Sequence, residues 1–275
     1  MKEKTKKWNS LLPRLITGIF GGAAVIFLLV IHQYTAFFML LLIGVGCLWE
    51  YYNIAKKSKL NPNLFSTLLG ALLLLLNLFF QFDIEWVLLF ILFLTACMEL
   101  IKENQNIVAT ISSTVLGLIY TLVPVILMAK TSVYEDTYDW RIVIALFIMI
   151  WAFDSGAYFA GKFFGKHKMI PNVSPGKTWE GTLGGCLLCF VSVFLFSNAF
   201  SFFTFFECIV YAVLVSICGT FGDLLVSQMK RNIDLKDTGS ILPGHGGFLD
   251  RFDGFLMAAS FYSITMLLLE NLGHI

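Results

Sequence analysis

The sequence predicts an all-α, polytopic integral membrane protein with about nine transmembrane helices. Of its 275 residues, 58% are hydrophobic and only 13% are charged. Apolar runs close to the ~20 residues that a helix needs to cross a bilayer recur along the chain. These runs are rich in Leu, Phe and Ile and do not alternate with polar residues. They therefore indicate helices rather than a barrel, because backbone groups inside lipid must satisfy their own hydrogen bonds.

Nine apolar runs are expected to span the membrane. They cover residues 15–32, 36–54, 64–82, 85–101, 107–129, 141–163, 180–200, 205–229 and 247–271. No small-residue cleavage site follows the first run, so we interpret it as a retained helix rather than a signal peptide. The chain divides by character into residues 1–140, with five plain spans, and residues 141–275, with four spans whose cytoplasmic loops carry the candidate active site.

The basic residues indicate the orientation of the spans. If the N-terminus is cytoplasmic, every one of the 19 Lys and Arg residues except Lys130 and Arg141 falls in a cytoplasmic loop or at the cytoplasmic end of a helix. Cytoplasmic loops of membrane proteins carry such an excess of positive charge. We therefore expect the N-terminus in the cytoplasm and the C-terminus outside, with the polar loops on the side where nucleotides are found.

A first group of polar residues runs from Asp154 to Gly181. Asp154 and Tyr158 are four residues apart and share one helix face, and Gly161 and Gly165 are expected to loosen the inner end of that helix. The span 180–200 is preceded by Ser174, Gly176, Lys177 and Thr178. Its N-terminus is a natural anion site, because the unpaired N–H groups and the helix dipole face the ligand. The candidate substrate-binding residues of this group are Asp154, Tyr158, Ser174, Lys177, Thr178 and Glu180. The alternative is an ordinary basic loop.

A second, denser group lies between residues 223 and 253 of an otherwise apolar sequence. Its candidate site residues are Asp223, Ser227, Lys230, Arg231, Lys236, Asp237, His245, Gly246, Gly247, Asp250, Arg251 and Asp253. Carboxylates brought together from two helix ends can hold Mg²⁺, and a Gly-rich turn lets backbone N–H groups approach a phosphate closely. The alternative is a solvated loop whose charges pair among themselves.

Other polar residues in the spans carry weaker signals. Cys186 and Cys189 form a CxxC pattern, but on a hydrophobic helix without a second pair we interpret them as packing residues. Glu50 and Glu99 lie near inner helix ends. We interpret each as solvated or paired with a neighbouring lysine, and the alternative that either takes part in the site stays open.

Both polar groups resemble one known family. From Ser227 to Asp253 the residues follow the pattern S-x-x-K-R-x(4)-K-D-x-G-x-x-L-P-G-H-G-G-F-x-D-R-F-D, which looks like the signature of the phosphatidate cytidylyltransferases, or CDP-diacylglycerol synthases. The patterns D-x-x-A-Y-x-x-G-K and S-P-x-K-T-x-E-G, between Asp154 and Gly181, resemble the same family. Over residues 1–140 the resemblance, to the bacterial form, rests only on length and hydropathy.

The resemblance implies a homodimeric enzyme of the inner (cytoplasmic) membrane of a bacterium, with its active site facing the cytoplasm. It would convert CTP and phosphatidate to CDP-diacylglycerol and pyrophosphate, with Mg²⁺ as cofactor. In the family, acidic residues that match Asp223 and Asp250 hold the metal centre, which can include a monovalent cation such as K⁺. We expect Asp237 and Asp253 to assist these two metal ligands.

The resemblance also assigns roles to the remaining candidates. The residues expected to act in catalysis are Asp223, Lys230, Arg231, Lys236, Asp237, His245 and Asp250. Four basic residues are expected to contact the phosphates of CTP and of the lipid, namely Lys177, Lys230, Arg231 and His245. Substrate binding is also assigned to Ser227, Gly246, Gly247 and Arg251, together with the candidates of the first group.

Two other classes of function stay open at this point. One is another CTP-dependent lipid enzyme, such as a polyprenol kinase or a CDP-archaeol synthase, built from similar parts. The other is a transporter or ion channel, in which intramembrane aspartates would line a pathway. The crowding of polar residues toward one membrane face argues against a transporter. No nucleic-acid partner is expected.

Overall fold

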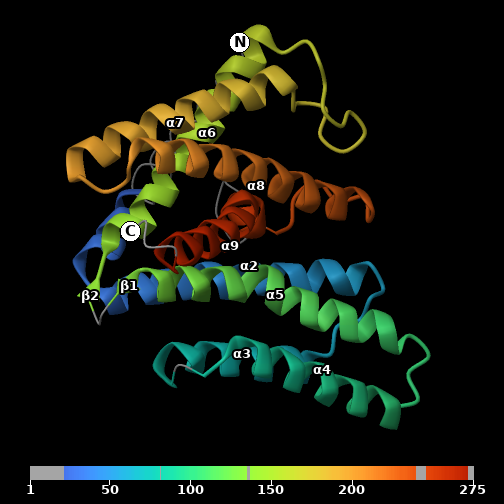
Figure 1. The fold of residues 1–275 in the computed structure, drawn as a ribbon. Helices are drawn as coiled ribbons and strands as arrows, with labels where there is room; N and C mark the ends of the chain where they lie inside the picture. The colour runs from blue at the N-terminus through green and yellow to red at the C-terminus, as the bar shows by residue number, and fades with distance from the viewer. Residues whose placement is uncertain (1–21, 81, 135–136, 240–245, 272–275) are drawn as a thin grey trace, which may run out of the picture.

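The computed structural model describes residues 22–80, 82–134, 137–239 and 246–271, and most of these residues are helical (Figure 1). The elements in chain order are a helix Gly22–Ile31, α2 (Gln33–Lys57), α3 (Leu64–Phe80), α4 (Ile84–Ile101), α5 (Ile107–Thr131), β1 (Val133–Tyr134), β2 (Thr137–Tyr138), α6 (Trp140–Phe164), α7 (Trp179–Phe200), α8 (Phe205–Arg231) and α9 (Leu249–Asn271). The two short strands form an antiparallel pair that links α5 to α6. The predicted all-α fold class is confirmed.

The predicted spans coincide in position with the helices of the described residues. Within the described residues, seven helices (α2 and α4 to α9) are long and apolar enough to cross a membrane. Helix α3 has 17 residues, or about 25 Å at 1.5 Å per residue, slightly less than the ~30 Å hydrocarbon core. The first predicted span is described only from residue 22, and the last helix begins at Leu249 rather than at residue 247.

The outer surface of the bundle is apolar. Large side chains such as Phe38, Trp49, Phe90, Leu187 and Phe221 are each more than half exposed. A surface of this kind would be unfavourable in water, whereas lipid chains accommodate it. Together with the long apolar helices, it identifies the chain as a polytopic helical membrane protein.

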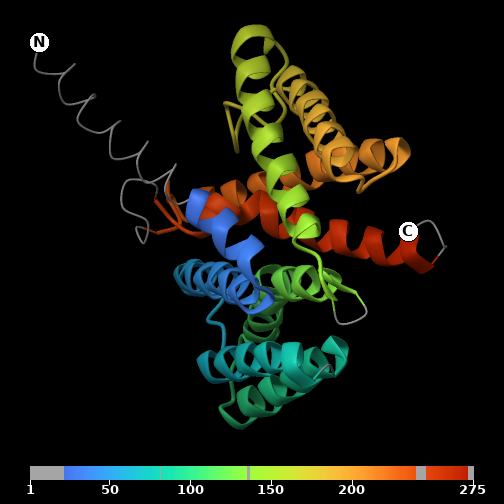
Figure 2. The ribbon, with the colours of Figure 1, turned by 90° about the vertical axis from the view of Figure 1, so that its left-hand side faces the viewer.

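The helices pack in successive layers (Figures 1 and 2). Helices α3 and α4 form one edge, and α2 and α5 lie between them and α9. Helix α8 covers the other side of α9, and α6 and α7 form the opposite edge. The loops that follow α2, α4 and α6 and the end of α8 all lie toward the right of Figure 1. The chain thus crosses back and forth, as the alternation of predicted spans requires.

Helix α9 lies in the middle of the bundle. It contacts α8, α5, α2 and α6, and its Phe255, Leu256, Ala259 and Tyr262 are at most 2% exposed. The middle of α9 is therefore surrounded by other helices rather than by lipid. Residues 1–140 and 141–275 consequently share one core, because α2 and α5 from the first part pack directly on α9.

Helices α6 and α7 approach each other through small residues. A Cβ atom placed on Gly156 would lie 2.8 Å from the Gly184 carbonyl oxygen, and one on Gly161 would lie 3.2 Å from Thr178 Oγ1. Such small-residue contacts allow close packing of membrane helices. The prediction that Gly161 loosens the end of its helix is wrong. Helix α6 continues to Phe164, and Gly161 instead provides room for the start of α7.

The CxxC pair packs as predicted. Cys189 is fully buried, and the Cys186 thiol lies 4.0 Å from the Ala212 carbonyl oxygen of α8. Both thiols are free. The pair thus contributes to the contact between α7 and α8.

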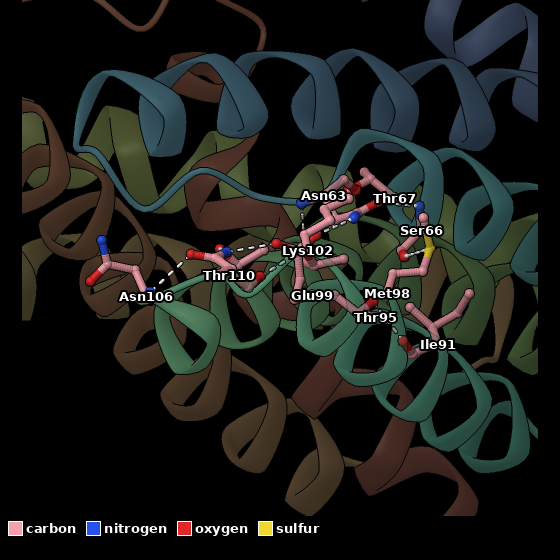
Figure 3. Close-up of polar contacts among 12 residues, drawn as sticks. Asn63, Ser66, Thr67, Ile91, Thr95, Met98, Glu99, Lys102, Asn106 and Thr110 are labelled. Carbon is pink, nitrogen blue, oxygen red and sulfur yellow. Dashed lines mark hydrogen bonds and ion pairs between the residues drawn. The ribbon is translucent and has the colours of Figure 1, made fainter.

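A buried polar cluster joins α3, α4 and α5 at the same end of the bundle as the long loops (Figure 3). The Glu99 carboxylate is 5% exposed and accepts hydrogen bonds from Asn63 (2.7 Å), Lys102 (2.7 Å) and Asn104 (2.6 Å). The Asn63 backbone N–H also donates to Thr114 Oγ1 of α5 (2.9 Å). The interpretation of Glu99 as a carboxylate paired with a neighbouring lysine is confirmed.

Candidate active site

The inner ends of α8 and α9 meet at an ion pair. Lys230 Nζ on α8 lies 2.5 Å from Asp250 Oδ1 on α9, and the two side chains are only 12% and 11% exposed. Because these charges are largely removed from water, each depends on the other to offset the cost of its lost hydration. The pair joins two candidate residues that the sequence places 20 positions apart.

Thr238 holds the other oxygen of the Asp250 carboxylate. The Thr238 backbone N–H donates to Asp250 Oδ2 at 2.7 Å, and the Thr238 hydroxyl lies 3.0 Å from the same oxygen. That hydroxyl also lies 2.6 Å from Oε2 of Glu50, a residue of α2. The orientation of Asp250 is thus set by Lys230 on one side and by Thr238 on the other.

Two glycines of the signature pass directly over the Glu50 carboxylate. A Cβ atom at Gly247 would collide with Thr238 Oγ1 and with Glu50, and a Cβ atom at Gly239 would collide with Glu50 Oε1. The glycines are therefore required by close packing at these positions. Gly247 is buried in this structure. Its contact with substrate stays a prediction.

Replacing Gly247 by Ala is expected to destabilise the folded protein. The added methyl group has no space beside Thr238 and Glu50, and overpacking of this kind typically costs about 1–3 kcal/mol. The thermal unfolding midpoint in detergent measures the effect. Gly176→Ala is the matched control, because a Cβ atom there meets nothing within 4 Å. Equal midpoints for the two variants would contradict this packing.

A cavity of about 330 Å³ lies between α6, the start of α7 and α8. Its lining includes six of the predicted site residues, namely Asp154, Tyr158, Ser174, Lys177, Thr178 and Asp223. Within it, Lys177 Nζ is 2.7 Å from Asp223 Oδ2, and Ser227 Oγ donates to Asp223 Oδ1 at 3.1 Å. The two polar groups of the sequence therefore converge on Asp223.

The loop between α6 and α7 is folded back on the start of α7. Thr178 is the N-cap of α7 and accepts from the Gly181 backbone N–H (3.1 Å). The Glu180 carboxylate accepts the backbone N–H groups of Lys166 and His167 and lies 2.5 Å from His167 Nδ1. In this structure Glu180 anchors the loop that carries Lys177, and its contact with substrate stays a prediction.

The remaining candidates lie around this centre. Arg231 Nε reaches the Val173 carbonyl oxygen of the α6–α7 loop at 3.5 Å, so it links the two loops. Lys236, Asp237 and Arg251 are exposed to solvent. Gly246 has φ of +84°, which favours glycine. The prediction for His245 lies outside the described residues.

Asp253 is buried one turn after Asp250. It is 8% exposed, and its Oδ1 accepts the backbone N–H of Gly254 at 2.6 Å. The Asp253 carbonyl oxygen lies so close to Gly222 that α8 has no room for a side chain there. Asp253 therefore stands at the closest approach of α8 and α9.

The carboxylates do not form a closed cage for a metal ion. Among the described residues, no group of three or more His, Cys, Asp and Glu side chains is arranged to hold a metal, and Asp223 and Asp250 are each paired with a lysine. Mg²⁺ usually takes only one or two protein carboxylates and completes its shell with waters and substrate phosphates. The donor chemistry therefore fits a Mg²⁺ ion that arrives with a phosphate ligand.

Sequence reasoning did not single out Thr238, and the interpretation of Glu50 as solvated or paired with a neighbouring lysine is wrong, because the carboxylate is buried against Thr238 and two backbone N–H groups. Glu50 is 2% exposed and, besides Thr238, accepts the backbone N–H groups of Phe248 and Leu249, both at 2.9 Å. An ionisable residue within a transmembrane helix is by itself a signal of function. Its partners are 188 or more positions away in the chain, so only the packing of α2 on α9 identifies its role.

Comparison with known proteins identifies the family. A model described as the cytidylyltransferase family matches residues 12–269. The phosphatidate cytidylyltransferase of Bacillus subtilis is 31% identical over 254 residues, which are 90% of this chain and 94% of that protein. The phosphatidate cytidylyltransferase of Haemophilus influenzae is 42% identical over 128 residues, which are 44% of this chain and 44% of that protein. That of Staphylococcus haemolyticus is 41% identical over 127 residues, which are 46% of this chain and 48% of that protein. The chain belongs to the cytidylyltransferase family.

Proposed function

We propose that the protein is a phosphatidate cytidylyltransferase, which transfers the cytidylyl group of CTP to phosphatidate and releases pyrophosphate. One structural observation carries the proposal. Two lysine–aspartate pairs, Lys177 with Asp223 and Lys230 with Asp250, join three separate segments at one end of a membrane bundle. The first of these pairs lines a cavity of about 330 Å³. The names of the relatives support this substrate pair.

The proposed reaction is a single in-line displacement. A phosphate oxygen of phosphatidate attacks the α-phosphorus of CTP, and the bond from that phosphorus to the oxygen bridging to the β-phosphate breaks. Pyrophosphate then leaves with the electron pair, and the products are CDP-diacylglycerol and pyrophosphate. A phosphate monoester with a second pKa of about 6 is largely ionised at neutral pH. The reaction therefore does not require a strong general base.

Bringing two anions together is the harder part of the reaction. Lys177 and Lys230 place positive charge beside the cavity and the first turn of α9, where they can offset the charge of the phosphates. In the absence of substrate each lysine is neutralised by an aspartate. Binding of a phosphate would give each lysine a second anionic partner and make its aspartate available.

The aspartates are the proposed ligands of Mg²⁺, with Asp223 and Asp250 as the principal ones and Asp237 and Asp253 assisting. A monovalent cation such as K⁺ is proposed to share this site. When bound, the metal supplies positive charge to the nucleophile and leaving group. Support comes from the partial exposure of the Asp223 side chain, 40%, toward the cavity.

The proposed setting is the inner membrane of a bacterium, with the N-terminus and the active site facing the cytoplasm and the C-terminus outside. The charge asymmetry supports this orientation, because Lys and Arg concentrate in the loops at the site's end of the bundle. We also propose a homodimer, on the resemblance to the family. Light scattering of the detergent complex would measure its mass, and a monomeric mass would contradict the dimer.

Release of pyrophosphate tests the proposed function. Purified protein in detergent is given CTP, dipalmitoyl phosphatidate and Mg²⁺, and parallel samples lack the lipid or contain EDTA. Release that requires both lipid and metal is expected. A folded protein that releases no pyrophosphate, or releases it equally without lipid, would contradict the proposal. Activity that persists in EDTA would contradict the metal assignment alone.

Replacing Lys177 by Ala is expected to weaken catalysis through substrate binding. The change removes one charge-assisted hydrogen bond, worth about 1.5–3 kcal/mol, so KM for one substrate should rise, or kcat fall, by roughly 10- to 100-fold. Steady-state kinetics with each substrate varied in turn measure both constants. Lys166→Ala is the control, because Lys166 is exposed on the same loop. If neither constant changed, Lys177 would be removed from the site.

A further inference from the structure

The Glu50 carboxylate lies beneath the loop that carries the signature. Although Glu50 belongs to α2, in the part of the chain with few polar residues, its side chain is 2% exposed. Its Oε1 accepts the Phe248 backbone N–H, and its Oε2 accepts the Leu249 backbone N–H, both at 2.9 Å. These N–H groups lie at the start of α9, where the helix dipole favours a negative charge.

This arrangement has a consequence for substrate binding. A helix N-terminus with unpaired N–H groups is a natural site for a phosphate. At the start of α9 that position is already filled by a carboxylate of the protein itself. The backbone N–H groups of Phe248 and Leu249 are therefore occupied by Glu50, which fixes the start of α9.

Thr238 extends the support from Glu50 to Asp250. The Thr238 hydroxyl lies 2.6 Å from Glu50 Oε2 and 3.0 Å from Asp250 Oδ2. Because a hydroxyl has one proton, it donates to one carboxylate at a time. The Thr238 backbone N–H donates to Asp250 at 2.7 Å, whichever carboxylate receives the hydroxyl proton. Glu50 thus contacts Thr238 and Leu249, which are the hydrogen-bond partner and the chain neighbour of Asp250.

We propose that Glu50 is a positioning residue for cytidylyl transfer, which acts by fixing Thr238 and the start of α9, and through them the carboxylate of Asp250. The proposal rests on the proposed function. It also explains why Gly239 and Gly247 lack side chains, since a Cβ atom at either would collide with Glu50. Groups that orient a reactive side chain commonly contribute 10- to 100-fold to activity.

The first test replaces Glu50 by Gln, which keeps the shape but only one of the two acceptor oxygens. An amide has one oxygen and one NH₂ group, so at least one N–H of the loop would face another donor. We expect kcat to fall by about 10- to 100-fold, with KM for CTP within about twofold because Glu50 does not line the cavity. Hydrogen–deuterium exchange should rise in the peptide that contains Phe248 and Leu249.

Glu99→Gln is the matched control. Glu99 is also a buried glutamate at this end of the bundle, with three hydrogen-bond donors of its own (Figure 3), but it lies among α3, α4 and α5. Its replacement should leave kcat per folded protein unchanged and should not increase exchange at Phe248. If both variants lowered kcat equally, or if Glu50→Gln lost activity only in proportion to unfolded protein, the proposal would be overturned.

Thr238 provides a second variant pair if Glu50→Gln fails to fold. Thr238→Val removes the hydroxyl that bridges Glu50 and Asp250 but keeps the backbone N–H, and kcat should fall by about tenfold or more. Thr238→Ser keeps the hydroxyl and should recover most of that loss. Wild-type activity in Thr238→Val would overturn the proposal. If the unmodified protein itself lacked transfer activity, the proposed function would fail instead.

Discussion

Replacement of Asp250 by Asn is expected to lower the rate of cytidylyl transfer by about 10²- to 10³-fold, the scale of losing one preorganised electrostatic group from an active site. Asn has the shape of Asp but no charge, so it can neither neutralise Lys230, now 2.5 Å away, nor serve as an anionic metal ligand. Transfer is measured as CDP-diacylglycerol formed per folded protein, with monodispersity in detergent as the measure of folding.

Asp234→Asn is the control for this variant. Asp234 is an exposed aspartate near the end of α8, and its φ of +53° is a conformation that Asn tolerates. The same chemical change at this position should leave activity within about twofold of the unmodified protein, because most surface substitutions have small effects. Substantial turnover by a folded Asp250→Asn protein would remove Asp250 from the catalytic residues.

Replacement of Asp223 by Asn is expected to have the second-largest effect, a loss of about 10²-fold or more. Asp223 contacts Lys177 (2.7 Å) and Ser227 (3.1 Å), and it borders the cavity beside Thr220 and Thr178. Its loss removes a carboxylate that links the α6–α7 loop to α8. The concentration of Mg²⁺ that gives half-maximal activity should also rise.

A double variant separates the two roles of Asp223. If its only role were to neutralise Lys177, the transfer rate of the double variant Lys177→Ala with Asp223→Asn should be no lower than that of the less active single variant. If Asp223 also acts on metal or substrate, the double variant should have a lower transfer rate than Lys177→Ala alone. The further loss should be roughly the full loss caused by Asp223→Asn. Our account predicts the second result. Recovery of activity in the double variant would contradict it.

The membrane architecture could be predicted from the sequence because it depends on local properties. A run such as residues 107–129 is recognised by its length and hydropathy alone, and α5 occupies Ile107–Thr131. Likewise, Asp223 and Ser227 fall on one helix face by their spacing, and the structure connects them by a hydrogen bond. Helical periodicity, which acts over a few residues, determines both features.

The contacts within the site could not be predicted, because they depend on how distant helices pack. Nothing in the spacing indicates that Lys177 meets Asp223 or that Lys230 meets Asp250. Glu50 reaches Thr238 across 188 positions. The prediction for Gly161 failed for the same reason, since the space it leaves is taken by Thr178 and Gly181 of the next helix.

The fate of the CTP phosphates distinguishes cytidylyl transfer from phosphorylation of the lipid. The protein is incubated with phosphatidate, Mg²⁺ and CTP that carries radioactive phosphorus at either the α- or the γ-phosphate, and the lipid is then extracted. Cytidylyl transfer predicts that the α-label enters the lipid as CDP-diacylglycerol and that the γ-label stays in water as pyrophosphate. Entry of the γ-label into the lipid would show a kinase and would contradict the account.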